Sequence, residues 1–144
     1  MARPATPADR ERIRDLLPAE ARATFDALPP EADAQMMVLD NDDGTLRGLL
    51  SAQVRGEAMF LQSIITARLD PEAFRLLLLG LAKRGIALGL TRGHSRTRDV
   101  AIMRFLVARY GLTAAPAGTE RGKVVEWTFD VDLAEFVATL EAAG

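Results

Sequence analysis

The sequence predicts an α/β (α+β) protein with one mixed sheet, in which antiparallel strands come first and a strand–helix–strand–helix–strand unit follows. Two apolar segments flank a polar turn that ends in glycine, residues 40–44, and indicate a hairpin. Leucines and Phe74 at helical spacing indicate a buried helix in the middle of the chain. Alternating apolar residues at 125–131 indicate a late strand. The complete predicted order is ααβββαβαβα.

The first predicted element is a helix that begins after Thr6. Thr6 suits the N-cap position, and Pro7 suits the first helical position, where its missing N–H is not needed. Pro18 ends this helix. A second short helix is expected at residues 19–28, before a pair of prolines.

Three strands are expected next, at residues 35–39, 46–55 and 58–69. Residues 46–55 alternate between apolar and polar side chains, as a strand with one buried face does. Short turns connect the three segments, so neighbouring strands are expected to run antiparallel.

The second half of the chain alternates helices and strands. A helix is expected at residues 70–84, with Phe74, Leu77, Leu78 and Leu81 on one face and Gly85 as its C-cap. The expected elements that follow are a short buried strand at 86–90, a polar loop at 91–97, a helix at 98–110 stopped by Gly111, a loop at 113–122, a strand at 124–131 and a final helix.

A chain of 144 residues, 49% hydrophobic and 26% charged, suits one folded domain, here residues 1–144. The absence of cysteine excludes disulfides and thiolate metal sites, and with a single histidine we expect no metal. The net charge of −2 argues against a general affinity for nucleic acid. The apolar run at residues 74–90 is interrupted by charges and glycines, so we expect no membrane span and a cytoplasmic protein.

The most unusual segment is residues 91–98, in which cations alternate with small or polar residues. In an extended backbone, the side chains of Arg92, His94, Arg96 and Arg98 would lie on one side. Such a row suits an anionic ligand, such as a phosphate, a nucleic-acid backbone or an acidic protein surface. The alternative is a solvated loop that follows a strand. Because no aromatic residues are interleaved, nucleic acid is the weaker ligand.

Three polar residues interrupt the apolar strand expected at residues 58–69, namely Gln62, Ser63 and Thr66. They face a ligand groove if two strands separate there. Otherwise they form hydrogen bonds with neighbours inside the core.

Three short motifs resemble those of the GNAT family of N-acetyltransferases. Residues 3–9, Arg-Pro-Ala-Thr-Pro-Ala-Asp, are similar to that family's first strand and helix start. Residues 43–48 resemble its Asp-Gly-x-hydrophobic-x-Gly hairpin, and residues 106–112 resemble the end of its late helix. Together with the order of elements, the resemblance spans nearly the whole chain and implies a GNAT-like mixed sheet.

The resemblance implies an acyltransferase that passes an acetyl or other acyl group from acyl-coenzyme A to an amine of a small molecule or a protein. In that family the pantetheine of coenzyme A (CoA) lies between two separating strands, and the pyrophosphate rests on N–H groups at the start of the next helix. Here the opening is expected between the strand ending near Leu69 and the strand starting at Ile86. The implied cofactor-binding residues are Thr66, Arg75 and Gly80, the last two by partial match to R/Q-x-x-G-x-G/A.

The chain departs from the family pattern at two sites. Leu78 stands where the first glycine of that motif is expected, and Asp70 would cap the helix with a carboxylate that opposes a second anion. The tyrosine that protonates the leaving thiolate in the family corresponds to Val107. Tyr110 is the catalytic candidate that remains, although its place on the apolar stripe of the helix suits a structural role.

These observations leave two functions open. The first is an N-acyltransferase that acts on an amine and whose proton transfer is relayed by water. The second is a catalytically inactive GNAT-like module that binds a protein partner within a larger assembly, such as a phage-type particle.

Overall fold

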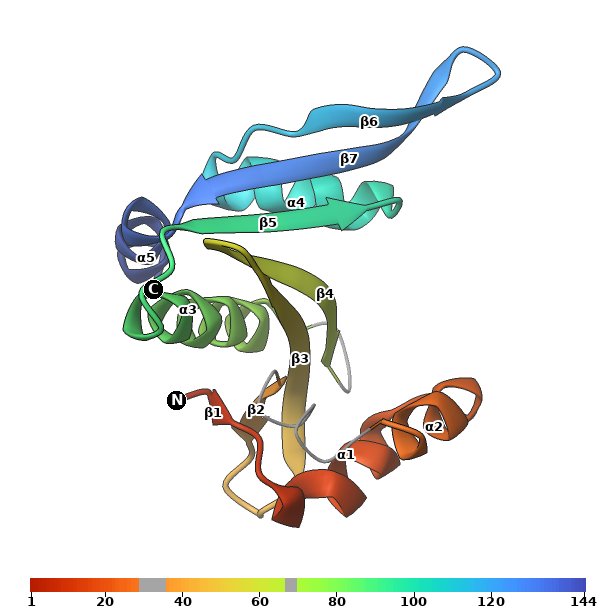
Figure 1. Cartoon of the computed structure of the whole chain (residues 1–144), viewed down its shortest axis with the longest axis vertical. Coiled ribbons are helices and arrows are strands. Elements are labelled where there is room, and N and C mark those ends of the chain that lie inside the picture. Colours follow the sequence, from red (N-terminus) through yellow and green to blue (C-terminus); the bar gives the residue numbers. More distant parts are fainter. Residues whose placement is uncertain (29–35, 67–69) are drawn as a thin grey trace.

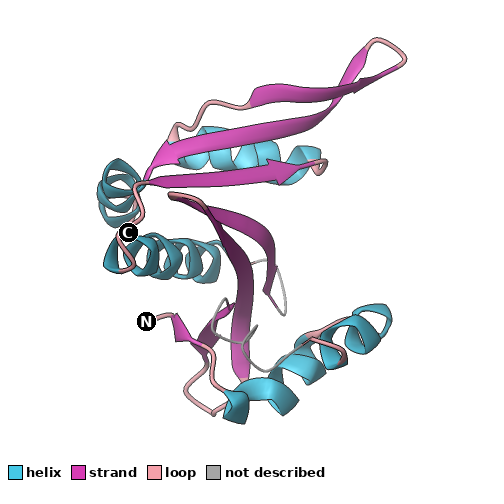
Figure 2. Cartoon of the chain, in the orientation of Figure 1, coloured by secondary structure: helices cyan, strands magenta, loops and turns pink. Residues whose placement is uncertain are grey.

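The computed structural model describes residues 1–28, 36–66 and 70–144, which form a seven-stranded mixed sheet with helices on both faces (Figure 1, Figure 2). The strands follow the order β1-β2-β3-β4-β5-β7-β6. Every neighbouring pair is antiparallel except β4 and β5, which are parallel. The mixed α/β fold that the sequence predicts is therefore confirmed.

The strands are β1 Arg3–Pro4, β2 Met36–Asp40, β3 Leu46–Arg55, β4 Ala58–Thr66, β5 Arg92–Thr97, β6 Ala115–Glu120 and β7 Lys123–Asp132. The helices are α1 Arg10–Leu16, α2 Ala19–Asp26, α3 Pro71–Ala87, α4 Val100–Tyr110 and α5 Leu133–Ala142, and the 3-10 turn η1, Pro7–Asp9, precedes α1. Three predicted boundaries lie outside the described residues, namely the prolines at 29 and 30, the strand start at Gln35 and the strand end at Leu69.

The predicted helix start after Thr6 is confirmed, and a network of charged side chains holds it. The N–H of Thr6 donates to Asp9 Oδ2 at 2.8 Å. The Asp9 side chain, which is nearly fully buried, also accepts from both Nη atoms of Arg3 at 2.9 Å and pairs with Arg12. Asp40 at the end of β2 accepts from the same two arginines. The bonds from Arg3, Thr6 and Arg12 hold the pKa of Asp9 well below its ordinary value and tie η1 and α1 to the sheet.

Apolar side chains form a cluster on each face of the sheet. Leu50 of β3 packs with Leu77 of α3 and Leu140 of α5, and all three are fully buried. On the other face, a smaller cluster joins Leu49 of β3 to Ile13 of α1. Figure 1 shows α3 on one side of β3 and the α1–α2 pair on the other. The α4 helix lies on the α3 side, since it contributes partly buried residues to the same cluster as α3 and α5.

The part of the sheet beyond β4 has one face that no described helix covers. Gly93 of β5 packs against Leu133 of α5, so the next side chain, His94, points to the opposite face. Phe60 of β4 and Asp130 of β7 stand beside His94 in register and share that face. We call this exposed surface of β4, β5 and β7 the open face.

Two expectations for the end of α3 were wrong. Residues 86–90 do not form a strand, because α3 continues to Ala87 and a left-handed Gly89, with φ of 81°, follows it. Gly85 is not the C-cap but lies inside α3. A Cβ at Gly85 would lie 2.7 Å from Leu133 Cδ1, so this glycine permits close packing of α3 and α5.

Two expected loops are strands. Residues 92–97 form β5, which pairs with β4 on one edge and β7 on the other. Residues 115–120 form β6, which pairs only with β7 and lies at the edge of the sheet. Both segments lack the large apolar residues by which a strand is recognised in a sequence.

The strands β4 and β5 separate after a short parallel contact. Residues 58–61 of β4 pair with residues 92–95 of β5. Beyond them β4 runs on to Thr66 beside β3, with Gln62 left unpaired at a bulge, whereas β5 runs on beside β7 (Figure 1). The predicted opening between two strands is therefore present, and its second strand begins at Arg92 instead of Ile86.

Candidate functional site

The separation of β4 and β5 opens a cavity of about 240 Å³. On the helix side its wall is apolar, with Phe74 and Leu78 from α3, Leu106 from α4 and Phe136 from α5. Such a wall excludes water and suits an uncharged group.

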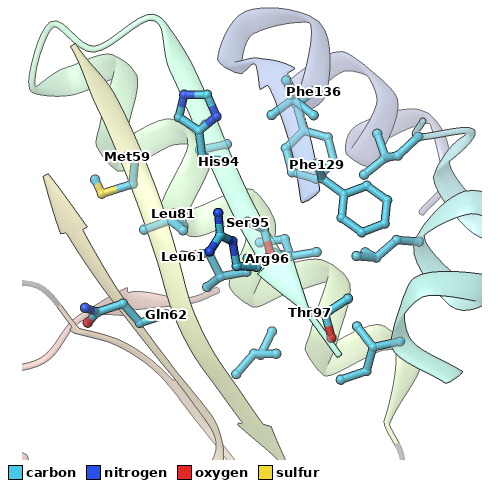
Figure 3. Close-up of a pocket in the computed structure, with 18 of the residues that line it drawn as sticks. Met59, Leu61, Gln62, Leu81, His94, Ser95, Arg96, Thr97, Phe129 and Phe136 are labelled. Carbon is cyan, nitrogen blue, oxygen red and sulfur yellow. The ribbon is translucent and has the colours of Figure 1, made fainter. Parts of the chain in front are cut away.

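The cavity is lined from both faces of the sheet. Leu61 and Ile64 line it from the α3 side, where both pack against the larger core cluster. Ser63, His94 and Arg96 line it from the open face. Figure 3 shows Leu61 on β4 and Arg96 on β5 at the two sides of the opening. Two molecules that approach from opposite faces of the sheet can therefore meet in this opening.

The row of cations predicted at residues 92–98 exists, and β5 holds its first three members on the open face. Arg92 Nη2 donates to Asp130 Oδ1 at 2.7 Å, and Arg92 Nε donates to the same oxygen at 3.2 Å. His94 Nδ1 lies 3.5 Å from that oxygen. An anion that binds to Arg92 or His94 must therefore compete with a carboxylate.

The other two cations of the row pair with glutamates. Arg96 Nε lies 3.0 Å from Glu126 Oε1, and the Glu126 side chain is 16% exposed. Arg98 donates to Glu120 Oε1 at 2.7 Å and to Glu126 Oε2 at 3.4 Å. The row thus forms a band of alternating charge instead of a continuous positive surface.

The carboxylates of this band were not predicted as part of a site. Glu126 and Asp130 lie on β7, and they alternate there with the inward-facing Trp127 and Phe129. The sequence carried a signal, because polar residues at every second position, here Glu126, Thr128 and Asp130, indicate the outer face of a strand whose other face is apolar. What it lacked was the pairing of β7 with β5.

The other polar residues predicted in β4 form hydrogen bonds with β3. Ser63 Oγ lies 2.7 Å from Ser51 Oγ, and Gln62 Nε2 lies 3.5 Å from Gln53 Oε1. Figure 3 shows the Gln62 side chain pointing away from β5. Thr66 ends β4 beside β3 and is not among the residues that line the cavity.

The start of α3 is capped by Asp70, as predicted. Asp70 Oδ1 accepts the N–H of Ala73 at 3.0 Å. The same carboxylate binds Arg47 of β3 through two hydrogen bonds of 2.8 and 2.9 Å. Pro71, at the first helical position, has no N–H. Of the N–H groups in the first turn of α3, one is therefore missing and another is already bonded to Asp70.

Two residues predicted to bind the cofactor lie further along α3. Arg75 donates to Glu72 at 2.6 Å and to the backbone oxygen of Leu140 at 3.1 Å, so it fastens α5 to α3. Gly80 lets α3 approach the N-terminus, because a Cβ there would lie 2.8 Å from Ala2 Cβ. In this structure both residues serve helix packing.

A second partial match to the family's phosphate motif lies just before and at the start of α3, which begins where it was predicted. If the motif R/Q-x-x-G-x-G/A precedes and begins the helix, it falls at residues 68–73. Arg68 matches its first position and Ala73 its last, while Pro71 replaces the first glycine. Arg68 lies outside the described residues.

Tyr110 lies in the core and not in the cavity wall. Its side chain is 5% exposed, and its ring packs edge-on against Phe105 and Phe136. Burial raises the pKa of Tyr110. Val107, at the position of the family's tyrosine, is 39% exposed and also lies outside the cavity wall.

The ionisable side chains that line the cavity, among the described residues, are His94 and Arg96. No group of three or more histidine, aspartate or glutamate side chains in residues 1–28, 36–66 and 70–144 is placed to hold a metal ion. None of the helices in the described part of the chain has the length and apolar character needed to cross a membrane.

Neither a protein-family model nor a curated protein matches the sequence. Solved structures do match the fold. The PaiA N-acetyltransferase of Thermoplasma acidophilum, in complex with coenzyme A, is 10% identical with a TM-score of 0.70, over 92% of this chain and 98% of that chain. A GNAT-family acetyltransferase of Listeria monocytogenes is 15% identical with a TM-score of 0.64, over 92% and 94%.

Diaminobutyrate acetyltransferase of Paenibacillus lautus, in complex with L-2,4-diaminobutyric acid and coenzyme A, is 17% identical with a TM-score of 0.64, over 92% of this chain and 93% of that chain. All three comparisons cover almost the whole length of both chains, and at these identities they establish the fold. The order of elements, the parallel pair β4 and β5 and the opening between them agree with it. The chain therefore has the fold of the GNAT acetyltransferases.

Proposed function

We propose that this protein transfers an acyl group from an acyl-coenzyme A to an amine. The observation that carries the proposal is the opening between β4 and β5, which joins an apolar cavity under the helices to the open face. Two proteins of the same fold, from Thermoplasma and Paenibacillus, hold coenzyme A in their structures, which supports this use of the opening. The reaction is proposed for the cytoplasm, a reducing compartment that suits a chain without cysteine.

The acyl donor suits the helix side of the opening. Beyond residues 61 and 95, β4 and β5 no longer pair with each other. The N–H and C=O groups on these two facing edges can therefore bond the amide groups of pantetheine. The apolar wall formed by Phe74, Leu78 and Leu106 suits the acyl group at the end of pantetheine.

The amine suits the open face. Of the two ionisable residues in the cavity wall, His94 is the one whose side chain has a nitrogen lone pair that can accept a proton, because a guanidinium has no acceptor. We assign to His94 the removal of the amine proton as the nitrogen bonds to the thioester carbonyl carbon. The carbon–sulfur bond then breaks, and the thiolate of coenzyme A takes a proton from water. Asp130 beside Nδ1 stabilises the imidazolium that forms.

The pyrophosphate of the cofactor would share the start of α3 with Asp70. The Asp70 carboxylate repels a phosphate, whereas Arg47 attracts one, and the two side chains are bonded to each other. Arg47 is thus a cation bonded directly to the cap of that helix, and a phosphate can recruit it once it competes with Asp70.

A second function is favoured by this same feature. A GNAT-like module without catalysis has no need of a phosphate site, and its helix start can be closed by its own carboxylate, as Asp70 closes α3. The placement of Tyr110 in the core, away from the cavity, fits this function as well. Such a module would use its surface to bind a protein partner.

Isothermal titration with acetyl-coenzyme A and with coenzyme A separates the two functions. The acyltransferase predicts a Kd in the micromolar range, about −8 kcal/mol. Ile64→Trp fills the cavity and is expected to abolish binding. Ile65→Trp is the matched control, since Ile65 is the next residue of β4, packs on the opposite cluster and does not line the cavity.

The outcomes are distinct if both variants keep the wild-type melting temperature. Loss of binding in Ile64→Trp alone supports the opening as the cofactor site, and a screen of amines for acetylation follows. No detectable heat at millimolar cofactor would exclude the acyltransferase and favour the binding module. If both variants bind the cofactor equally well, the cofactor site does not lie in the opening.

A further inference from the structure

Arg96 differs from the other arginines of its row in the state of its guanidinium. Arg92 uses Nε and Nη2 for Asp130, and Arg98 uses both Nη atoms for Glu120 and Glu126. Arg96 forms an ion pair with Glu126, in which Nε lies 3.0 Å from Oε1. Within the described residues, no hydrogen bond reaches either of its Nη atoms.

The two Nη atoms of Arg96 lie where a ligand in the cavity can reach them. Arg96 is one of the cavity-lining residues, whereas Arg92 and Arg98 are not. Its side chain is 59% exposed on the open face, and its Nε pairs with the partly buried Glu126. Figure 3 shows the Arg96 side chain at the opening between β4 and β5. A cation at the mouth of a cavity whose Nη atoms make no other hydrogen bond is suited to hold a ligand.

The geometry points to an acceptor amine that itself carries a carboxylate, as an amino acid does, held by the two Nη atoms of Arg96. A guanidinium offers parallel N–H groups that match the two oxygens of a carboxylate, and such charge-assisted pairs are stronger than neutral ones. No carboxylate lines the cavity among the described residues, so nothing there favours a second ammonium group. This inference rests on the proposed acyl transfer and names the substrate class of the same site.

The carboxylate belongs to the acceptor and not to the acyl group. Arg96 lies on the open face, from which the amine approaches, and the wall offered to the acyl group by α3 and α4 is apolar and includes Phe74, Leu78 and Leu106. A dicarboxylic acyl group, such as succinyl, would bring its second carboxylate against that apolar wall, where an unpaired charge is costly.

The first test uses binding alone, so it is independent of catalysis. N-acetyl α-amino acids, which are the products of the proposed reaction, are titrated into 15N-labelled protein together with their uncharged amides. We expect the acids to shift the backbone and guanidinium signals of Arg96 and to bind roughly tenfold to a hundredfold more tightly than the amides. Arg96→Ala should abolish this difference, and Arg96→Lys should restore only part of it, because lysine lacks the fork.

Arg92→Ala is the matched control, since it removes the same residue type from the same strand and face without touching the cavity. It should leave the preference for acids unchanged. If acids and amides bind equally, or if Arg92→Ala removes the preference as fully as Arg96→Ala does, the inference is overturned. Circular dichroism and the melting temperature show whether each variant is folded.

The second test measures acetyl transfer to amino acids and to their amides with acetyl- and succinyl-coenzyme A. A higher kcat/KM for the acids, lost in Arg96→Ala, supports the inference. If succinyl transfer depends on Arg96 while the acids have no advantage, the carboxylate belongs to the donor and the inference is wrong. If no amine is acetylated but the acids still bind at Arg96, the acyl transfer fails and the carboxylate site stands.

Discussion

Replacing Asp70 by serine tests where the phosphates of the cofactor lie. Serine also serves as an N-cap, so it can accept the N–H of Ala73 while the negative charge is removed. The replacement further releases Arg47, which Asp70 binds through two hydrogen bonds. If the pyrophosphate rests on the start of α3, both effects strengthen the binding of coenzyme A.

The magnitude follows from the geometry of the cap. Asp70 Oδ1 lies 3.0 Å from the nitrogen of Ala73, the place that a phosphate oxygen would take. While Asp70 stays there, the pyrophosphate must remain roughly 6 Å from the carboxylate. The pyrophosphate carries about two negative charges, so at that distance the two groups repel by about 1.4 kcal/mol in a water-like dielectric. Removing that repulsion lowers the Kd for coenzyme A about tenfold.

The assay is calorimetric titration of coenzyme A into the wild type and two variants. Asp132→Ser is the matched control, because Asp132 caps α5 in the same way, by accepting the N–H of Glu135 at 3.0 Å. Only Asp70→Ser should tighten binding, and the gain should shrink as salt is added. Adding Arg47→Ala to Asp70→Ser should remove part of the gain.

The result that refutes this reasoning is a Kd for Asp70→Ser that equals or exceeds the Kd for Asp132→Ser. The phosphates would then not lie at the start of α3. If the cofactor nevertheless bound in the opening, its affinity would come from pantetheine and the acyl group.

Three further predictions concern stability and rate. Asp9→Asn should lower the free energy of unfolding at pH 7 by about 2–4 kcal/mol. Because folding lowers the pKa of Asp9, this contribution is present above the unfolded pKa of about 4 and is lost as the pH falls towards the lower folded pKa. The denaturant unfolding curves of wild type and variant should therefore converge in acid. His94→Gln should slow acetyl transfer at neutral pH by about a hundredfold or more without changing the Kd for coenzyme A, and an equal rate in the variant would show that water takes the proton. Gly93→Val should cost about 1–3 kcal/mol in denaturant unfolding, because a Cβ there already lies 3.0 Å from Leu133 and 3.1 Å from Val131; an unchanged midpoint would show that α5 shifts freely.

The sequence predicted the helices and the antiparallel hairpins because their buried faces are built from apolar residues at regular spacing. It did not predict β5, for a physical reason. One face of β5 carries Gly93 in close contact with α5, and the other carries charged side chains paired to β7. Neither face needs a large apolar residue, so the segment has the composition of a loop.

The end of α3 shows a similar limit. A glycine after a basic turn indicates a C-cap, and Gly85 fits that pattern. Its actual role depends on Leu133 of α5, which lies 48 positions later in the numbering and presses on α3 at this point. Gly89, with its left-handed backbone, follows the helix instead. A local pattern cannot separate a glycine needed for conformation from one needed for close approach.

The candidate site was predicted in outline and missed in its electrostatics. The opening between two strands and the row of cations were both expected, but the carboxylates of β7 that pair with the row depend on a strand neighbour that the sequence does not reveal. Their effect is to change the kind of ligand that fits. A polyanion would need a continuous positive surface, whereas the open face presents neutralised pairs.

What remains after this pairing is the guanidinium fork of Arg96 at the mouth of the cavity. An acyltransferase can use this fork for the carboxylate of its acceptor amine, and a binding module can use it for an acidic group of its partner. They differ in the use of the space behind it. A module that recognises a partner by its surface has no need of an apolar cavity of about 240 Å³ that is lined from both faces of the sheet. Transfer of an acyl group between molecules on opposite faces requires that space, and the cavity is therefore the stronger argument for catalysis.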